Sequence, residues 1–144
     1  METAALIVSD LDLFKSINDR HGHAAGDRII QSFAKLLQRG TPRDALIARL
    51  GGEEFAVLLP SCDLSTAHRI AENLRTTFKA SAPDVVHGTQ HPTASFGIAI
   101  GTGHEELGAL LDQADRALYQ AKQEGRDCVR SLGQNFGDRW LTAL

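Results

Sequence analysis

Short apolar runs alternate with longer periodic stretches along the first half of the chain, and they predict strands and helices. The run at residues 4–8 ends in Ser9-Asp10-Leu11-Asp12, which is typical of a buried strand that emerges into solvent. From Leu13 to Arg39, apolar residues recur at three- and four-residue steps. They predict helix, which Gly22 and Gly26 divide into a short piece and a longer one.

A hairpin and a further helix follow. Two strand-like runs, residues 45–50 and 55–59, flank Gly51-Gly52-Glu53-Glu54, where glycine permits the positive φ of a tight turn. Asp63 or Ser65 can cap the amphipathic helix that comes next.

The second half of the chain continues the same alternation. Residues 93–100 predict a strand, residues 107–121 carry a helical apolar stripe that ends at Gly125, and residues 128–132 predict an edge strand. Residues 80–93 contain prolines and several polar residues, so they predict a loop with room for a small hairpin.

This order of elements predicts an α+β fold, because every helix carries one apolar stripe that a sheet must cover. A ferredoxin-like core, with antiparallel strands in a central sheet and helices packed on it, is the simplest topology. We expect one domain over residues 1–131, followed by a tail or short docking helix over residues 132–144.

Composition narrows the function classes. The 144 residues are 42% apolar, enough for one core, and 15 Lys+Arg against 18 Asp+Glu give a net charge of −3, which disfavours general binding to nucleic acid polymers. No apolar run approaches the roughly 20 residues of a membrane span, and Glu2-Thr3 after Met1 is unlike a secretory signal. Cys62 and Cys128 are too few for a disulfide framework or a four-thiolate zinc site, so a cytoplasmic location fits best.

Two acidic pairs stand where we expect the backbone to expose them: Asp10 and Asp12 after the first strand, and Glu53 and Glu54 at the glycine turn. If the first strand lies beside the hairpin, the pairs converge at one edge of the sheet. Their carboxylates could then hold Mg²⁺, whose open positions accept substrate phosphates, or two ions about 3.5–4 Å apart. The alternative, equally open for any single acid, is a solvated side chain at a strand end or turn.

Besides these acids, the chain contains a series of different short motifs. They are, in order, Asp10-Leu11-Asp12-Leu13-Phe14-Lys15, Asn18-Asp19, Gly22-His23, Gly26-Asp27, Arg49-Leu50-Gly51-Gly52-Glu53-Glu54-Phe55, Ser95-Phe96-Gly97, Ala114-Asp115, Ala121-Lys122 and Gly125-Arg126. In order and spacing they resemble the GGDEF family of diguanylate cyclases, from about Ala5 to Val129. One motif alone would be weak, but so many in register are specific.

The resemblance implies a nucleotide-cyclase-like form of the ferredoxin-like fold, with GGEEF on a β-hairpin. Such domains condense two GTP into cyclic di-GMP and release two pyrophosphates with Mg²⁺ or Mn²⁺, so the resemblance implies a nucleotidyltransferase. It also implies a face-to-face homodimer in the productive complex, because each 3′-hydroxyl must reach the other α-phosphate. An attached sensor or regulatory domain outside this chain is expected, in a parent protein that is either cytoplasmic or tethered to a membrane that this domain does not contact.

By position in the family, Asp10 and Glu53 look like the metal ligands, helped by the carbonyl of Leu11 and the carboxylate of Glu54. Glu53 also looks like the residue that assists deprotonation of the attacking hydroxyl, directly or through the metal.

The resemblance gives the phosphates a second set of contacts. Backbone N–H groups of Leu13, Phe14 and Lys15, at the first turn of a helix, would face the β- and γ-phosphates. Lys122 and Arg126, which their spacing places four apart on one helix face, add cations there. Outside the motif context, both cations would be interpreted as a solvated helix face.

Asn18 and Asp27 match the guanine-binding residues of the family. An Asp accepts hydrogen bonds from the N1–H and N2–H₂ groups of guanine, which adenine lacks, so this pair favours GTP over ATP. The alternative for both residues is helix capping, which is common for Asn and Asp at helix breaks.

The sequence departs from the family in three places. Pro42-Arg43-Asp44-Ala45 stands where many members have an Arg-x-x-Asp product site, so we predict no high-affinity inhibitory site of that form, unless the register slips by one residue. Calorimetry of a Glu53 variant tests this, since submicromolar cyclic di-GMP binding that Arg43 and Asp44 variants abolish would contradict it. Asp127 replaces the usual Asn after Gly-Arg. The chain also begins almost on its first strand, where members carry a helix whose absence would expose apolar sheet surface.

Two function classes stay open. One is an active cyclase, and the other is a catalytically silent module that binds GTP or cyclic di-GMP and regulates an attached domain; a structural dimerisation domain is a weaker third. Silent members commonly lose an acid at the position of Glu53 or Glu54. Both acids are present here, which favours the active cyclase.

Overall fold

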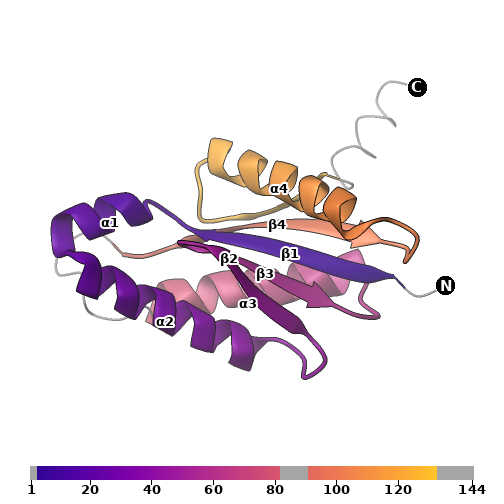
Figure 1. The fold of residues 1–144 in the computed structure, drawn as a ribbon, viewed down its shortest axis with the longest axis horizontal. Helices are drawn as coiled ribbons and strands as arrows, with labels where there is room; N and C mark the ends of the chain where they lie inside the picture. The colour runs from indigo at the N-terminus through magenta and orange to yellow at the C-terminus, as the bar shows by residue number, and fades with distance from the viewer. Residues whose placement is uncertain (1–2, 82–90, 133–144) are drawn as a thin grey trace.

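A computed structural model describes residues 3–81 and 91–132 of the chain. In this part of the chain, four helices and one five-stranded sheet follow the predicted order, so the α+β fold is confirmed (Figure 1). The elements are β1 (Ala4–Leu11), α1 (Phe14–His21), α2 (His23–Gly40), β2 (Leu46–Gly51), β3 (Glu54–Leu59), α3 (Leu64–Ser81), β4 (Ala94–Gly101), α4 (Leu107–Gln123) and β5 (Val129–Ser131).

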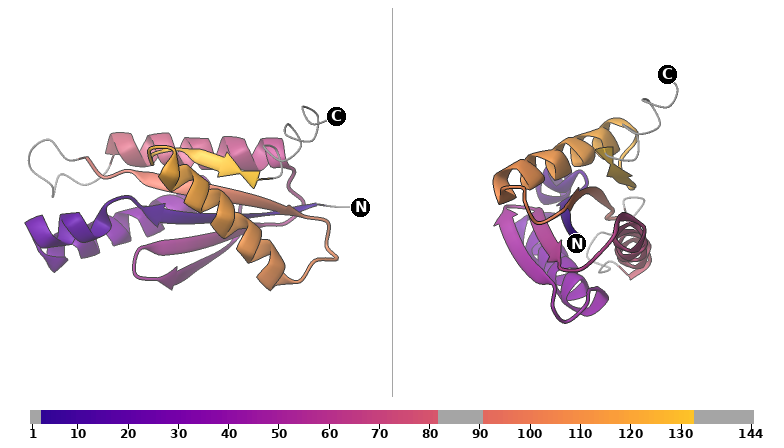
Figure 2. Two further views of the ribbon diagram at one scale, coloured as in Figure 1. Left: turned by 90° about the horizontal axis from the view of Figure 1, so that it is seen from above. Right: turned by 90° about the vertical axis from the view of Figure 1, so that its right-hand side faces the viewer.

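The sheet has the strand order β2-β3-β1-β4-β5, with β1 in the middle. Neighbours are antiparallel from β2 to β4, whereas β5 runs parallel to β4. The first four strands and the helices between them form the expected ferredoxin-like core, and α4 and β5 extend it. Figure 2 shows α4 crossing one face of the sheet, while α2 and α3 lie on the other.

Alternate residues of β1 face the two helical layers. Ala5 and Ile7 pack with α2 and α3, whereas Leu6 and Val8 pack with α4. Phe33 of α2 is fully buried in the first layer. Odd-numbered residues of β1 therefore face α2 and α3, and even-numbered residues face α4, so the position of a polar residue along β1 determines which layer it faces.

Helix α4 lies unusually close to β4. A Cβ added to Gly97 would stand 2.2 Å from the carbonyl oxygen of Ala114 and 2.3 Å from the backbone nitrogen of Leu118. Because these neighbours are backbone atoms that cannot turn aside, only glycine at position 97 allows the approach. The approach fixes the height of α4 above the sheet and therefore the position of its C-terminal end.

The helix boundaries refine the prediction. The break between α1 and α2 is at Gly22, which has φ +88°, whereas Gly26 is buried inside α2 and breaks nothing. Asp63, not Ser65, caps α3, because the Thr66 N–H donates to Asp63 Oδ1 at 2.8 Å. The predicted small hairpin and the C-terminal tail fall outside the described residues.

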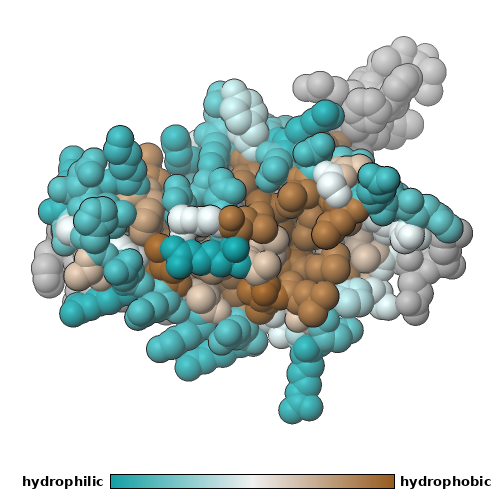
Figure 3. All heavy atoms as spheres, in the orientation of Figure 1, coloured by the Kyte–Doolittle hydropathy of each residue, from teal (hydrophilic) through white to brown (hydrophobic). Residues whose placement is uncertain are grey.

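Apolar side chains gather on the α4 face of the sheet, beside the edge strand β2 (Figure 3). Leu46, Leu50 and Leu107 leave 65%, 44% and 64% of their surface exposed. Among the described residues, no helix is both long enough and apolar enough to cross a membrane.

Candidate active site

The register between β1 and β3 brings the two acidic pairs together. Asp10 is the cross-strand partner of Glu54, and the Leu11 N–H donates to the Glu53 carbonyl oxygen at 3.3 Å. The first strand therefore lies beside the hairpin, which is the condition for the acids to converge at one edge of the sheet.

The hairpin turn between β2 and β3 is fixed by Arg49. Its Nε and Nη2 atoms donate to the Gly52 carbonyl oxygen at 2.9 and 2.7 Å. Glu53 in the turn and Glu54 beside it are both partly exposed. Their carboxylates can therefore reach a ligand while the backbone that carries them is held.

Asp10 is buried, with 5% of its surface exposed, which corrects the expectation that this acid is exposed. Its Oδ2 accepts a hydrogen bond from Lys122 Nζ of α4. Its Oδ1 is buried and has no hydrogen-bond partner among the described residues. Burial raises the pKa of Asp10, and although Lys122 opposes this, the charges of Glu53 and Glu54 add to the rise. One oxygen of the carboxylate thus lacks a hydrogen-bond partner, and the surroundings as a whole disfavour the charged form.

The donor set at this edge fits a hard divalent cation. Mg²⁺ takes oxygen ligands and is commonly held by one or two carboxylates together with water and substrate phosphates. The unpartnered Oδ1 of Asp10, the carbonyl of Leu11 and the carboxylates of Glu53 and Glu54 belong to that class. Within the described ranges, no group of three or more His, Cys, Asp or Glu side chains is arranged to hold a metal ion by itself.

Asp12 has a structural role, which corrects its interpretation as an exposed acid that joins Asp10 in a metal site. It is equally buried, at 5% exposed, but both of its oxygens are used. Thr93 Oγ1 and the Asp127 N–H donate to Oδ2 at 2.8 and 3.0 Å, and Ser95 Oγ donates to Oδ1 at 2.7 Å. Asp12 therefore ties the end of β1 to β4 and to the segment after α4.

Helix α1 begins directly after these acids. Leu13 is its N-cap and has φ +55°, a left-handed conformation that is rare for leucine. The first-turn N–H groups, those of Phe14 and Lys15 included, have no intrahelical acceptor. The N-cap residue supplies no side-chain acceptor for them either. The side chain of Phe14 is buried and that of Lys15 is exposed. The predicted phosphate contacts would therefore use backbone donors that the helix itself does not need.

Asn18 and Asp27 do not cap helices. The N-cap positions of α1 and α2 are Leu13 and Gly22, which excludes the capping alternative. Asn18 Oδ1 is buried and lacks a hydrogen-bond partner within the described part of the chain. Gly26 makes room for this oxygen, because a Cβ there would lie 1.8 Å from it. Asp27 follows on α2 and is exposed.

Lys122 and Arg126 do not share a helix face, which corrects the prediction from their spacing. Helix α4 ends at Gln123, and the Arg126 N–H donates to the Ala121 carbonyl oxygen at 3.0 Å. This bond is typical of a glycine-terminated helix end, so the chain leaves the helix axis before position 126. Arg126 is exposed, with φ +63°, whereas Lys122 reaches Asp10 from the last turn of the helix.

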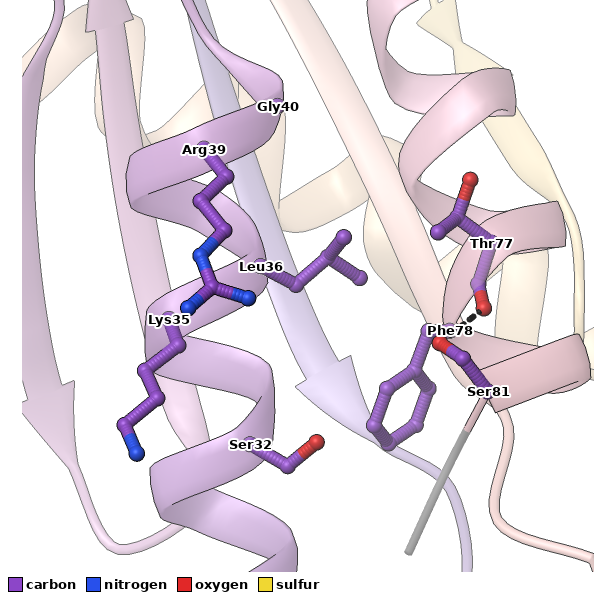
Figure 4. A pocket seen from close by; sticks show the side chains of 8 residues that line it. All are labelled: Ser32, Lys35, Leu36, Arg39, Gly40, Thr77, Phe78 and Ser81. Carbon is purple, nitrogen blue, oxygen red and sulfur yellow. Dashed lines mark hydrogen bonds between the residues drawn. The ribbon is translucent and has the colours of Figure 1, made fainter.

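A hollow of about 510 Å³ lies elsewhere, between α2 and α3 (Figure 4). Lys35 and Arg39 line it from α2, and Thr77 and Ser81 line it from α3, where Ser81 Oγ donates to the Thr77 carbonyl oxygen at 2.6 Å. None of the predicted site residues lines this hollow. We place the candidate site where β1 ends beside the β2–β3 hairpin, because two buried oxygens there, Asp10 Oδ1 and Asn18 Oδ1, lack hydrogen-bond partners among the described residues and no such atom lines the hollow.

Sequence reasoning assigns no role to Asp127, Arg75 or Lys79, yet they form an ion-pair cluster beside the site. Both Arg75 and Lys79 lie 2.7 Å from a carboxylate oxygen of Asp127. The signal available in the sequence was a pair of cations four residues apart on a helix, but this pattern is common on solvated faces. Nothing in the spacing indicates the distant partner.

Known proteins of similar sequence and structure identify the family. Residues 1–128 match the family described as "Diguanylate cyclase, GGDEF domain". The chain belongs to this family. It is 43% identical over 130 residues to an uncharacterized protein, YhcK, of Bacillus subtilis (strain 168), and 38% identical over 125 residues to diguanylate cyclase DgcM of Escherichia coli (strain K12).

Each of these two matches covers 87% of this chain but only 35% and 30% of the relative, so the chain spans about a third of their length. A solved structure, the active GGEEF domain of a diguanylate cyclase from Vibrio cholerae, has a TM-score of 0.82 to this GGDEF domain at 31% sequence identity. That match covers 90% of this chain and 82% of the other.

Proposed function

We propose that this GGDEF domain is an active diguanylate cyclase that condenses two GTP into cyclic di-GMP with Mg²⁺ or Mn²⁺. The observation that carries the proposal is a pair of buried oxygens, Asp10 Oδ1 and Asn18 Oδ1, that lack hydrogen-bond partners among the described residues. Buried polar atoms in folded proteins are nearly always hydrogen-bonded. One of these oxygens belongs to a predicted metal ligand and the other to a predicted guanine contact, whereas a third such atom, Ser131 Oγ, lies on β5.

At each of two GTP molecules, the reaction forms a bond between a 3′-oxygen and an α-phosphorus and breaks the bond from that phosphorus to pyrophosphate. Pyrophosphate leaves with the electron pair of the broken bond. Each chain would hold one GTP, and a two-fold arrangement of two chains would bring each 3′-hydroxyl to the other α-phosphate. We assign Glu53, at the hairpin turn, to assist deprotonation of the hydroxyl, either as a general base or through the metal ion.

Asp10, Glu53, Glu54 and the Leu11 carbonyl would hold the metal ion, which when bound supplies positive charge beside the reacting phosphate. Lys122 would exchange its contact with Asp10 for one with a phosphate oxygen. The remaining work is positioning and neutralisation of charge, which dominate phosphoryl-transfer catalysis.

The rest of the nucleotide would be held by residues on three elements. The N–H groups of Leu13–Lys15 and the guanidinium of Arg126 would bind the β- and γ-phosphates. Asn18 and Asp27 would bind the polar edge of guanine. Support for this substrate comes from the relative DgcM, which is named a diguanylate cyclase.

Incubation of the full chain with GTP and Mg²⁺, followed by chromatographic separation of the products, tests the proposal. Cyclic di-GMP that forms with the parent chain and is lost in Glu53→Ala would support it. Tight GTP binding without product would replace it with the silent binding module.

A further inference from the structure

An ion-pair cluster beside the candidate site joins α3 to the segment that follows α4. Arg75 Nη1 donates to Asp127 Oδ1, and Lys79 Nζ donates to Asp127 Oδ2, both at 2.7 Å. Arg75 also pairs with Glu72 of its own helix at 2.5 Å. The side chains of Arg75 and Asp127 are 17% and 22% exposed, so water screens this pair less than it screens an ordinary surface salt bridge.

The backbone of Asp127 is held as firmly as its side chain. Its N–H donates to Asp12 Oδ2 at 3.0 Å and to Ser95 Oγ at 3.1 Å. Asp127 and the preceding Arg126 both have left-handed φ angles, +48° and +63°. Such conformations cost about 1–2 kcal/mol for residues other than glycine and persist only where the surroundings hold them.

We propose that Arg75, Lys79 and Asp127 form a clamp that positions Arg126 for the triphosphate. This inference rests on the proposed function, in which Arg126 binds the phosphates. The Arg126 side chain is exposed and makes no salt bridge within residues 3–81 and 91–132, so the local backbone alone sets the direction in which it leaves the chain. The clamp holds that backbone one residue away, and its three members are positioning residues.

The charge state of Asp127 agrees with this role. Burial raises the pKa of the carboxyl, but hydrogen bonds from Lys79 and Arg75 outweigh burial and hold the pKa below its usual range. Asn, the residue expected here from the family resemblance, could accept a hydrogen bond from Arg75 but would lack the charge that attracts Lys79. Asp127→Asn should therefore weaken the clamp without removing it.

The test uses the double variant Arg75→Gln/Lys79→Gln of the full chain. The matched control is Lys35→Gln/Arg39→Gln, which also removes one Arg and one Lys four residues apart on a helix, at the rim of the α2–α3 hollow. Two properties are measured: the affinity for a non-hydrolysable GTP analogue with Mg²⁺, by calorimetry, and the rate of tryptic cleavage after Arg126. The second measurement needs no nucleotide.

We expect the clamp variant to bind the analogue about 10-fold more weakly and to be cut faster after Arg126, while the control matches the parent. In an Arg126→Ala background, the clamp substitutions should change the affinity by less than about twofold, because they act through Arg126. Asp127→Asn should give an intermediate affinity, and it carries the affinity test if the double variant does not fold.

Equal affinity and equal cleavage in the clamp and control variants would overturn the clamp. So would an undiminished loss of affinity in the Arg126→Ala background, because the residues would then act on the nucleotide by another route. If the parent chain binds no analogue, the proposed function fails, and the rate of cleavage after Arg126 alone decides whether the clamp exists.

Discussion

Asp10 and Asp12 are two residues apart and equally buried, but only one of them has its hydrogen bonds completed by the protein. Each leaves 5% of its surface exposed. Asp12 accepts hydrogen bonds on both oxygens. The donors are Ser95 in β4, Thr93 just before β4, and the backbone N–H of Asp127 after α4. Asp10 has one oxygen without a partner among the described residues. The fold therefore satisfies both oxygens of one carboxylate and only one oxygen of the other, and we propose that a ligand satisfies the remaining oxygen.

Burial does not distinguish Asp10 from Asp12, whereas hydrogen-bond satisfaction does. A buried polar atom without a partner costs free energy, and a ligand that supplied the missing contact would recover it. Asn18 repeats the pattern of Asp10 on α1. We call Asp10 and Asn18 the open positions, and Asp12 with its donors Thr93 and Ser95 the closed network.

The substitutions Asp10→Asn and Asp12→Asn should show the largest difference between the open positions and the closed network, in both activity and stability. Asp10→Asn should lower the rate of cyclic di-GMP formation about 10²–10³-fold, because a charged group at the reacting phosphate is lost. The free energy of unfolding of Asp10→Asn should stay the same or increase, because burial disfavours the charged carboxylate that the substitution removes. Asp12→Asn should lose about 1–3 kcal/mol of stability, because an amide NH₂ cannot accept from the donors around it.

Product chromatography and urea unfolding of both variants measure these effects. Equal losses of stability in Asp10→Asn and Asp12→Asn would show that hydrogen-bond satisfaction does not distinguish the two sites.

Gly26→Ala should close the open position at Asn18. In an exposed helix, this change would stabilise the chain by about 1 kcal/mol, but here the new Cβ would lie 1.8 Å from Asn18 Oδ1 and displace it. We expect GTP affinity to fall about 10-fold, because a contact to guanine is lost. Gly108→Ala in α4 is the matched control, since no heavy atom lies within 4 Å of its added Cβ. Calorimetric titrations that give the same affinity for both variants would contradict the role of Asn18.

The fold and the meeting of the acids could be predicted from the sequence, because both follow from residue order along the chain. The apolar period assigned the helices and strands, and a β1–β3 pairing beside the glycine hairpin was enough to bring Asp10 to Glu54. The difference between Asp10 and Asp12 could not be predicted. The donors to Asp12 are separated from it by 81, 83 and 115 positions in the sequence, and no local sequence pattern predicts these contacts.

The misplaced Arg126 has a different cause. A four-residue spacing fits a helix face, so Lys122 and Arg126 were predicted to share one, yet the same sequence predicts that the helix ends at Gly125. The two predictions are incompatible, and the structure follows the helix end, with Arg126 in a left-handed conformation beyond it. Spacing predicts a shared face only inside the helix, so a terminating glycine should have taken precedence.

Lys122→Met should change how strongly the open position at Asp10 binds a metal ion. Lys122 contacts Asp10 Oδ2 and therefore competes with a cation for that carboxylate. Its loss should tighten Mn²⁺ binding to the nucleotide-free chain about fivefold, equivalent to about 1 kcal/mol. Lys35→Met removes the same charge from α2 and should leave the affinity nearly unchanged. Electron paramagnetic resonance of free Mn²⁺ measures both, and weaker binding in Lys122→Met would disprove the competition.

The smallest expected effect is the pH dependence of stability at two acids whose pKa values shift in opposite directions. Burial raises the folded-state pKa of Asp10, so its contribution to stability is present when the carboxyl is protonated and is lost as pH rises through that pKa. At Asp127, burial is outweighed by Lys79 and Arg75, so the pKa is lowered. Its contribution is present above the unfolded pKa and is lost as pH falls through the folded one.

At pH 7, Asp10→Asn should therefore be more stable than the parent chain and Asp127→Asn less stable, each by no more than about 1 kcal/mol. The difference at Asp10→Asn should shrink as pH falls toward about 4, because the raised pKa lets the parent carboxyl protonate above the ordinary aspartate value, whereas the difference at Asp127→Asn should shrink only as pH falls below about 4. Urea unfolding at a series of pH values measures the two differences. A deficit of Asp10→Asn at pH 7 that disappears at low pH would mean that Lys122 stabilises the charged Asp10 more than burial destabilises it, and the open position would then be an ordinary buried salt bridge.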